Sequence, residues 1–331
     1  MSRFAKTQVK VGWMSRELGL MSERGYRGVA KSEWNGTESG LLNLNKPGGM
    51  TSRDVVNIIS RQRRGMKVGH AGTLDPLASG VLVVCLGKAT RLIEYVQRMP
   101  KTYRTTVRLG AVSNTLDADG EVVEVEAPRQ PTEPEIREAL LPLIGTVLQK
   151  PPEVSALKVG GKRAYDLARS GQVVVLEPRL VRIDRIDLLK YEWPRLELEI
   201  ACGSGTYVRS IARDVGEALG CGGLVEVLIR TRIGRFHIED ALDPMTLTAE
   251  TLPRSLRPAS EAVAALPSLA VTDAQVAELI QGRALSLAAF AGTSILAGEV
   301  ALVGPDGELV AIAEAIPDSG TILPRRVLAT A

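Results

Sequence analysis

The feature that most constrains this fold is an apolar run at residues 81–86, VLVVCL, in which five of six side chains are aliphatic. A short run of this kind behind a glycine-bounded turn predicts a buried core strand. The turn before it, VGHAGTLDPLASG, holds the acid Asp75 and one of the two histidines of the chain, His70. The sequence thus places a single carboxylate in the loop that enters the core.

The neighbouring segments predict an α+β fold. TSRDVVNIISRQRRG predicts a helix capped by Thr51 or Ser52, and ATRLIEYVQRM predicts a second helix. KTYRTTVRLG alternates as a strand does, with Tyr103 and Leu109 on the same side. RLELEIACGSGTYVRSIARDVGEALG predicts a strand, a glycine turn and an amphipathic helix.

Composition divides the chain into three regions. Residues 1–39 show no hydrophobic period and are expected to form a mobile N-terminal extension, which is shorter if translation starts at Met14 or Met21. Residues 40–262 carry the periodic elements. Residues 263–331 contain few charges and several apolar runs bounded by glycine, which predicts hairpins in a small β-rich domain.

Charge and composition exclude some classes of function. The net charge of +3 and the pI near 8.8 permit a nucleic-acid partner without requiring one. Three Lys and Arg stand against seven Asp and Glu in residues 262–331, which argues against strong phosphate contacts there. No apolar run approaches the ~20 residues of a membrane helix, and the charged N-terminus does not suit a signal peptide. Three distant cysteines predict a reducing cytoplasm and thiols without a metal role.

Three common motifs are absent. LGKAT lacks the Ser or Thr of a P-loop, because Ala89 stands there. GCGGLV fails the dinucleotide fingerprint, because Val225 occupies the last glycine position. Ser79 with His70 and Asp75 does not make a nucleophilic triad, because SGVL is not a nucleophile elbow.

From the residues alone, Asp75 is explained equally well as a turn residue and as a catalytic group. Asp before Pro commonly begins a turn. GSGTYVRS, however, presents Tyr207 and Arg209 at the start of a helix, and an arginine near Asp75 would keep it ionised by lowering its pKa. An ionised carboxylate can act as nucleophile or base, and Tyr103 could stack on a flat ligand. The alternatives are that Tyr207 only packs and that Arg209 is solvated.

Seven segments together resemble one enzyme family. NLNKPGGMTS, VGHAGTLDPLASGVL, GKATR, KTYRTTVRLG with DADG, SALKVGGKRAYDLAR, GTYVRSIARDVG and LIRTRIGRF occur in the order and spacing of the TruB-type bacterial tRNA pseudouridine synthases. The resemblance runs from Gly40 to about Asp240, and more weakly beyond. Its GH-G-LDP-A-G block is highly specific. Two departures are Ala71, where the family often has Thr, and Ile229, where a frequent Arg and with it one phosphate contact is missing.

The resemblance implies an isomerase that converts uridine to pseudouridine at position 55 in the T loop of tRNA, by base flipping and an aspartate-dependent break and re-formation of the glycosidic bond. It implies the pseudouridine synthase fold, with a central mixed, largely antiparallel sheet flanked by helices and a small C-terminal PUA-like domain. Neither a metal nor a cofactor is expected. The implied site residues are Asp75 as the catalytic aspartate, Arg209 as its ion-pair partner, Tyr103 as the stacking ring, Tyr207 and Leu228 as walls, His70 as the residue that helps hold the flipped loop open, and Lys46 in a turn of the same pocket.

The resemblance also implies how the chain meets RNA. The basic insertion 151–179 is expected to be a thumb that closes on the T arm, with an ordinary surface loop as the alternative. The region 263–331 is expected either to contact tRNA weakly or to be structural. We expect a monomeric cytoplasmic protein with tRNA as its partner and no membrane contact.

Two other classes stay open at this stage. One is a non-catalytic RNA-binding or RNA-folding protein on the same scaffold, and the other is the guide-RNA-dependent relative of archaea and eukaryotes. Asp75, Arg209 and Tyr103 occurring together favour an enzyme. The absence of a long Lys-rich tail favours the stand-alone form.

Overall fold

The computed structural model describes residues 39–126, 129–154, 158–159, 162–163, 176–290 and 296–329. The predicted N-terminal extension, apart from Ser39, lies outside the described residues, and so does most of the predicted thumb. Two short strands of the thumb region, β8 (Lys158–Val159) and β9 (Lys162–Arg163), pair antiparallel. The roles of the extension and the thumb stay predictions.

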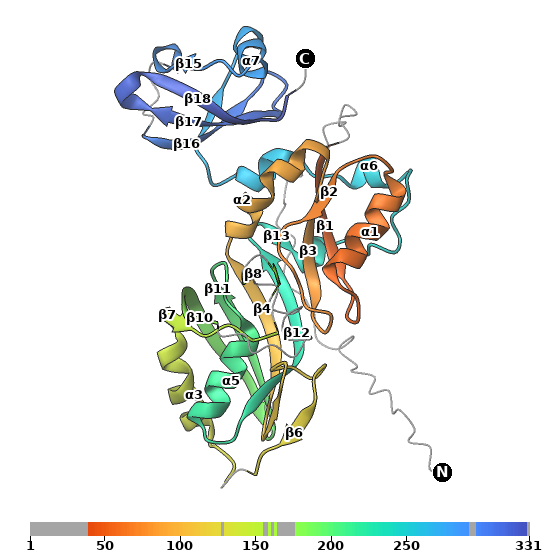
Figure 1. The fold of residues 1–331 in the computed structure, drawn as a ribbon, viewed down its shortest axis with the longest axis vertical. Helices are drawn as coiled ribbons and strands as arrows, with labels where there is room; N and C mark the ends of the chain where they lie inside the picture. Colours follow the sequence, from red (N-terminus) through yellow and green to blue (C-terminus); the bar gives the residue numbers. More distant parts are fainter. Residues whose placement is uncertain are drawn as a thin grey trace, which may run out of the picture. The chain divides into compact units, whose positions relative to one another are not determined.

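A large mixed sheet forms the centre of the described fold (Figure 1). Within the described residues it has nine strands: β1 (Gly40–Lys46), β2 (Val68–His70), β3 (Ser79–Leu86), β4 (Lys101–Leu109), β7 (Gly145–Gln149), β10 (Arg179–Glu192), β11 (Arg195–Cys202), β12 (Gly223–Ile233) and β13 (Phe236–His237). The order is β1-β3-β12-β4-β11-β10-β7, with β2 beside β3 and β13 beside β12. Only β3 and β12 pair in parallel among these strands, so the predicted mixed, largely antiparallel sheet is confirmed.

Strand β3 is buried on both faces, as its apolar run predicts. Alternate side chains point to opposite faces of a strand. Leu82 and Val84 therefore pack in one hydrophobic cluster, with α1, and Val81 and Val83 in another, with α2. Gly80 at its start has φ +102°, and a Cβ there would lie 2.3 Å from the carbonyl oxygen of β12 beside it. A glycine is therefore required where β3 and β12 meet.

Helices flank the sheet (Figure 1). The α-helices are α1 (Ser52–Gln62), α2 (Ile93–Arg98), α3 (Glu133–Leu140), α5 (Val208–Ala218), α6 (Leu252–Ser255) and α7 (Asp273–Ile280). The 3₁₀ helices are η1 (Gly87–Leu92), η2 (Leu141–Leu143), η3 (Ile238–Asp240), η4 (Ala259–Val263), η5 (Leu287–Phe290) and η6 (Pro317–Ser319). Thr51 caps α1 and forms a capping box with Asp54, which confirms the predicted helix start. The second predicted helix is divided into η1 and α2.

The alternation predicted for residues 101–109 is present in β4, where every second side chain is buried. These inward side chains join a cluster with α3 and α5, to which Val107, Ile136 and Ile211 belong. After β4 the chain turns through a small hairpin, β5 (Ala111–Ser113) and β6 (Val122–Glu124). The connection between these two strands contains the DADG segment, residues 117–120.

The C-terminal region is β-rich, as predicted. Its sheet has the order β14-β16-β17-β18-β15. The strands are β14 (Ser268–Ala270), β15 (Leu285–Ser286), β16 (Gly298–Val303), β17 (Leu309–Ile316) and β18 (Thr321–Val327). Strands β16 and β17 form one of the expected hairpins, with Pro-Asp-Gly in its turn and φ +80° at Gly307. One hydrophobic cluster contains both Phe236 and Ile312, so apolar packing continues past residue 262, and the domain boundary there stays a prediction.

Candidate active site

Asp75 lies in the loop between β2 and β3. Hydrogen bonds from a side chain of α1 and within the loop itself hold the backbone there. The hydroxyl of Ser52, the first residue of α1, accepts a hydrogen bond from the Leu74 amide (2.8 Å) and donates one to the Leu74 carbonyl (3.1 Å). Within the loop, the amide of Ala78 donates to the carbonyl of Asp75 (3.1 Å). The start of a helix and a tight turn thus hold the backbone on both sides of the carboxylate.

The side chain of Asp75 pairs with Arg209, as the sequence predicts. Arg209 Nη2 lies 2.9 Å from Asp75 Oδ2, and Nη1 lies 3.3 Å from Oδ2 of a second acid, Asp117. Arg209 is 5% exposed and Asp117 6%, whereas Asp75 retains 37% of its surface. The guanidinium also donates to the carbonyls of Thr115 (2.7 Å) and Val154 (3.1 Å). Arg209 therefore bridges two carboxylates, the buried one of Asp117 and the partly exposed one of Asp75.

The pKa of Asp75 is raised above its ordinary value of 3.8. Burial raises this pKa most, the charge of Arg209 lowers it, and the charge of Asp117 raises it again. Arg209 lowers the pKa of Asp75, as predicted, but desolvation by the surrounding protein raises it by more, so the net shift is upward. The carboxyl is enclosed on most sides, and its remaining exposure is toward one hollow.

That hollow, called the Asp75 hollow below, has a volume of about 310 Å³. Its lining comes from the loop before β3, the end of α2, the start of β4, the glycine turn and first residues of α5, and the middle of β12. The lining residues are Gly72, Thr73, Leu74, Asp75, Gln97, Lys101, Tyr103, Gly203, Ser204, Gly205, Thr206, Tyr207, Val208, Arg209, Leu228 and Arg230. Asp75, Tyr103, Tyr207, Arg209 and Leu228, five of the seven predicted site residues, are thus brought together.

Tyr103 and Tyr207 reach the hollow from different elements. Tyr103 is an inward residue of β4 and is 8% exposed, and burial raises the pKa of its phenol. Tyr207 precedes α5, where the side chain of Gln149 on β7 accepts from its amide (2.8 Å) and donates to its carbonyl (3.1 Å). The edge of the sheet therefore sets the position of Tyr207 through its backbone.

Lys46 is not among the residues that line the hollow. Its side chain is fully buried, and its ammonium donates to the carbonyls of Pro47 (2.9 Å), Met50 (2.6 Å) and Pro76 (3.4 Å). Burial lowers the pKa of Lys46 to about 8, against the opposing charge of Asp75. Lys46 thus holds the carbonyl that follows Asp75 from behind the loop.

His70 also lies outside the lining of the hollow. It is the last residue of β2, half-buried, and faces Val84 across the β2–β3 pair. Its place is five residues before Asp75 on the same loop connection. The expected role beside the flipped RNA stays a prediction.

Three lining or supporting residues were missed by sequence reasoning. Neither Asp117, between β5 and β6, nor Arg230, next to Ile229 on β12, is among the site residues expected from the sequence. Lys101 is in phase with Tyr103 on β4, so an ionic residue at an inward strand position was a detectable sign. Asp117 had no comparable sign, since a loop carries no periodicity.

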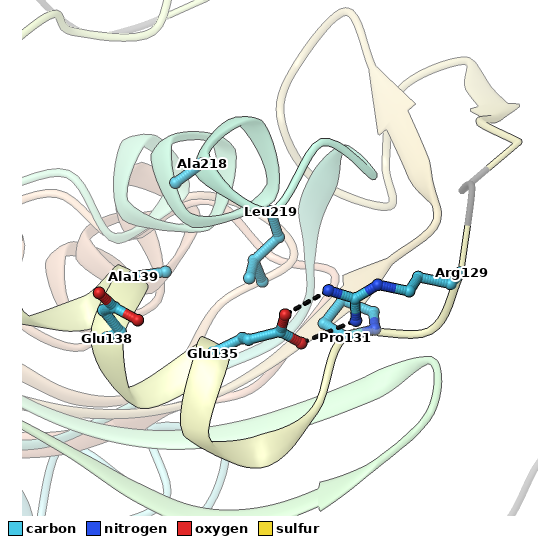
Figure 2. Close-up of a pocket in the computed structure, with 7 residues that line it drawn as sticks. All are labelled: Arg129, Pro131, Glu135, Glu138, Ala139, Ala218 and Leu219. Atoms are coloured by element: carbon cyan, nitrogen blue, oxygen red, sulfur yellow. Dashed lines mark hydrogen bonds and ion pairs between the residues drawn. The ribbon is translucent and has the colours of Figure 1, made fainter.

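A second hollow, between α3 and α5, contains none of the predicted site residues (Figure 2). Its volume is about 370 Å³. Figure 2 shows Glu135, one of its two acids, held by both terminal nitrogens of Arg129. These hydrogen bonds, first among several causes, lower the pKa of Glu135 strongly. A carboxylate held in an exposed pair is poorly placed for catalysis, so we assign no chemistry to this hollow.

The described residues offer no obvious place for a metal. In the part of the chain that the structure describes, no three His, Cys, Asp or Glu side chains gather as metal ligands would. Cys85, Cys202 and Cys221 are buried free thiols. No helix among the described residues is long and apolar enough to cross a membrane.

Comparison with known protein families gives two matches along this chain. The family model described as TruB family pseudouridylate synthase (N terminal domain) matches residues 59–208, and that of the tRNA pseudouridylate synthase B C-terminal domain matches residues 209–264. The chain is 42% identical over 284 residues to a tRNA pseudouridine synthase B from Mycobacterium sp. (strain KMS), covering 84% of this chain and 93% of the relative. It is 43% identical over 248 residues to one from Heliobacterium modesticaldum, covering 74% and 81%.

Among solved structures, the crystal structure of a Cbf5-Nop10-Gar1 complex contains a similar chain. The TM-score is 0.68 at 26% identity, with 88% of this chain and 85% of that chain covered. The structure of an H/ACA RNP bound to a substrate RNA containing 2′-deoxyuridine gives a TM-score of 0.67 at 25% identity, covering 88% and 85%. The chain is therefore similar to known proteins both in sequence and in fold.

Proposed function

Because the chain belongs to the TruB family of pseudouridylate synthases and is thus an isomerase of uridine in tRNA, we propose that its target is the uridine at position 55 in the T loop. We further propose that Asp75 is the catalytic carboxylate. One observation carries this assignment: Asp75 is the acid that is both paired with a buried arginine and open to the hollow. Asp117, the other acid of that group, is closed off.

The isomerisation needs one carboxylate in a space shielded from solvent. A base in a folded RNA loop must be flipped out before an enzyme can reach its glycosidic bond, at a cost of a few kcal/mol. Asp75 then either bonds to the sugar carbon C1′ or takes a proton from the sugar. In both routes the bond between N1 and C1′ breaks, the uracil turns, and C5 bonds to C1′. All atoms of the product come from the one nucleotide.

The other predicted site residues support the same substrate. Tyr103 offers an aromatic face on which a flipped uracil can stack. Tyr207 and Leu228 enclose the space, and Arg209 keeps the carboxylate in place. Lys46 is a positioning residue in this proposal, since its ammonium reaches only backbone carbonyls among the described groups.

RNA binding has a candidate surface at the end of α1. Residues 55–93 contain six Lys and Arg and one acid, Asp75. Four of these cations line a hollow beside the end of α1 and the start of η1, here called the α1 basic surface: Arg63, Arg64, Lys67 and Lys88. Lys and Arg gathered on one face are typical of contacts to nucleic-acid phosphates. We propose that the backbone of the bound tRNA follows this surface.

The expected site of the reaction is the cytoplasm, because tRNA is the substrate. The stand-alone form is favoured over the guide-RNA-dependent form, because the curated relatives at 42–43% identity are tRNA pseudouridine synthases B.

The position of the target is tested with an unmodified tRNA transcript. Incubation with the protein, followed by carbodiimide treatment and primer extension, should give one stop at position 55. A transcript with cytidine at that position should give none. Stops elsewhere, or conversion of the cytidine variant at another uridine, would contradict the proposed position while leaving the isomerase activity intact.

A further inference from the structure

Two buried cations line the Asp75 hollow and have no part in the mechanism given above. Lys101 is 7% exposed and Arg230 is 1% exposed, and both face the hollow. They come from adjacent strands, Lys101 from the start of β4 and Arg230 from β12. Charged side chains are rarely buried unless an opposite charge compensates them.

The contacts of both side chains are to uncharged groups. Lys101 Nζ donates to the carbonyls of Gln97 and, at 2.7 Å, of Met99. Arg230 donates through Nε to the carbonyl of Val81 (2.7 Å), and through its terminal nitrogens to two carbonyls of the loop before Asp75 (3.1 and 3.4 Å). Among the described residues, no carboxylate oxygen lies within 4.0 Å of either cation.

The two cations also act on each other. Burial lowers the pKa of Lys101 to about 8, and the charge of Arg230 acts in the same direction. Two like charges near each other in a desolvated place cost stability unless an anion offsets them. The fold therefore keeps an unfavourable arrangement that a bound negative charge would relieve.

Their position relative to the base is set by strand register. Lys101 and Tyr103 are two residues apart on the inward face of β4, and Arg230 stands directly opposite Tyr103 on β12. The proposed stacking ring is thus flanked by both cations. Asp75, Arg209 and Asp117 form a separate group in which two acids share one cation. Lys101 and Arg230 therefore add two positive charges to the lining of the hollow, beside the paired charges of Asp75 and Arg209.

The reaction produces a negative charge on the base. When the bond between N1 and C1′ breaks, its electron pair stays on the uracil, whether C1′ bonds to Asp75 or the sugar loses a proton. The charge spreads over N1 and the two carbonyl oxygens. It disappears when C5 bonds to C1′, after which the C5 proton leaves and N1 takes up a proton. Fixed positive groups at such a position lower the barrier, because they stabilise charge that exists only near the transition state.

We propose that Lys101 and Arg230 stabilise the negative charge that the uracil gains when its glycosidic bond breaks. This inference rests on the proposed function, because it needs a flipped uridine in the Asp75 hollow. It assigns Lys101 a catalytic role toward the base and gives Arg230 two tasks. The second task of Arg230 is to hold the carbonyls of Gly72 and Thr73, and with them the loop of Asp75.

The test replaces Lys101 by Met, which keeps the length of the side chain and removes its charge. Single-turnover conversion at saturating enzyme should slow by about 10²- to 10³-fold, the loss seen when one group that stabilises transition-state charge is deleted. The tRNA dissociation constant should stay within a few-fold, and the melting temperature should not fall, because a buried uncompensated charge has gone. A merely structural lysine would instead lose melting temperature.

Further variants sharpen the result. Lys101→Gln can still donate to the carbonyls of Gln97 and Met99, and it should be as slow as Lys101→Met. Lys101→Arg should recover part of the rate. The matched control is Lys190→Met, which removes an exposed lysine of β10 that pairs with Glu192 (3.1 Å), and it should be as fast as the wild type.

A better leaving group gives the most specific readout. 5-Fluorouridine at the target position leaves as a more stable anion, so the deficit of Lys101→Met in glycosidic bond cleavage should be smaller than with uridine. An equal deficit on both substrates would overturn the proposal. So would a wild-type rate in Lys101→Met, or weakened tRNA binding with an unchanged rate, which would indicate a phosphate contact. An inactive wild-type protein would contradict the proposed function itself.

Discussion

At the residue scale, the chemistry of Asp75 depends on competing effects of its neighbours. Burial raises its pKa, Arg209 lowers it, and the negative charge of Asp117, which also pairs with Arg209, raises it. The carboxyl therefore differs from a solvent-exposed acid and also from one whose charge is fully compensated by an ion pair. Two changes test this arrangement, one at the carboxylate and one at its cation.

Asp75→Asn keeps the shape of the side chain and removes the charge and the reacting oxygen. Turnover should fall by at least ~10⁴-fold, the scale seen when a reacting group is deleted. The melting temperature should not fall at neutral pH, because a carboxyl with a raised pKa opposes folding when it is ionised. Single-turnover conversion and a thermal melt check both. Turnover within a hundred-fold of wild type in a folded variant would refute the catalytic role.

Arg209→Gln tests the pKa. The acid limb of the wild-type profile, where the rate falls as the pH is lowered, should lie above pH 3.8. Asp75 must be ionised to react, and its pKa is raised above that value. Removing the opposite charge of Arg209 raises that pKa further, so the limb should move to still higher pH. The pH dependence of single-turnover conversion measures this shift. A limb that moves to lower pH would show that Arg209 does not stabilise the ionised form.

At the scale of elements, the start of α1 holds the catalytic loop. Ser52 is 1% exposed and makes both of its hydrogen bonds to the backbone of Leu74. Its neighbour Thr51 caps the same helix through Asp54 and does not bond this loop in the described contacts. The two adjacent residues therefore separate helix capping from loop positioning.

Ser52→Ala should lower the free energy of unfolding by about 1–3 kcal/mol, because it leaves buried backbone groups of Leu74 without a partner. It should also slow turnover of the folded protein, since the loop that carries Asp75 loosens. Thr51→Ala is the control and should cost ~1 kcal/mol through the missing helix cap, with turnover unchanged. Denaturant titration and single-turnover rates measure the two effects. Equal rates in both variants would mean that the loop holds its shape without Ser52.

At the scale of the whole molecule, charge is unevenly distributed. The net charge is only +3, but residues 55–93 carry six cations and one acid. The end of α1 and the start of η1 bring four of the cations to one hollow. A polyanion such as tRNA would meet this surface even though the protein as a whole is weakly basic.

Replacing Arg64, Lys67 and Lys88 together by Ala should weaken tRNA binding and reduce its dependence on salt. The slope of log K against log salt should fall by about 0.7–0.9 for each phosphate group that the variant no longer neutralises. The rate at saturating enzyme should be retained, since none of the three lines the Asp75 hollow. Filter binding at several salt concentrations measures the slope. An unchanged slope would remove the α1 basic surface from the RNA interface.

Local pattern was enough to predict much of the scaffold. The apolar run of β3, the capping signature at Thr51 and the alternation of β4 are each set by neighbours in sequence, and each element formed where it was expected. The turn before β3 also made Asp75 a candidate, because a single acid between a glycine turn and a core strand is conspicuous. The family resemblance then supplied the companions of Asp75, four of which line the same hollow.

Tertiary structure alone decided what these groups do to one another. Asp117 joins the site because a loop after β5 reaches Arg209, and no periodicity announces such a contact. The direction of the Asp75 pKa follows from how much protein surrounds the carboxyl, a property of packing in three dimensions. Lys101 and Arg230 become neighbours only through the pairing of β4 with β12. Helices and strands follow from spacing along the chain, whereas desolvation and Coulomb interactions depend on distances across the fold, which spacing does not contain.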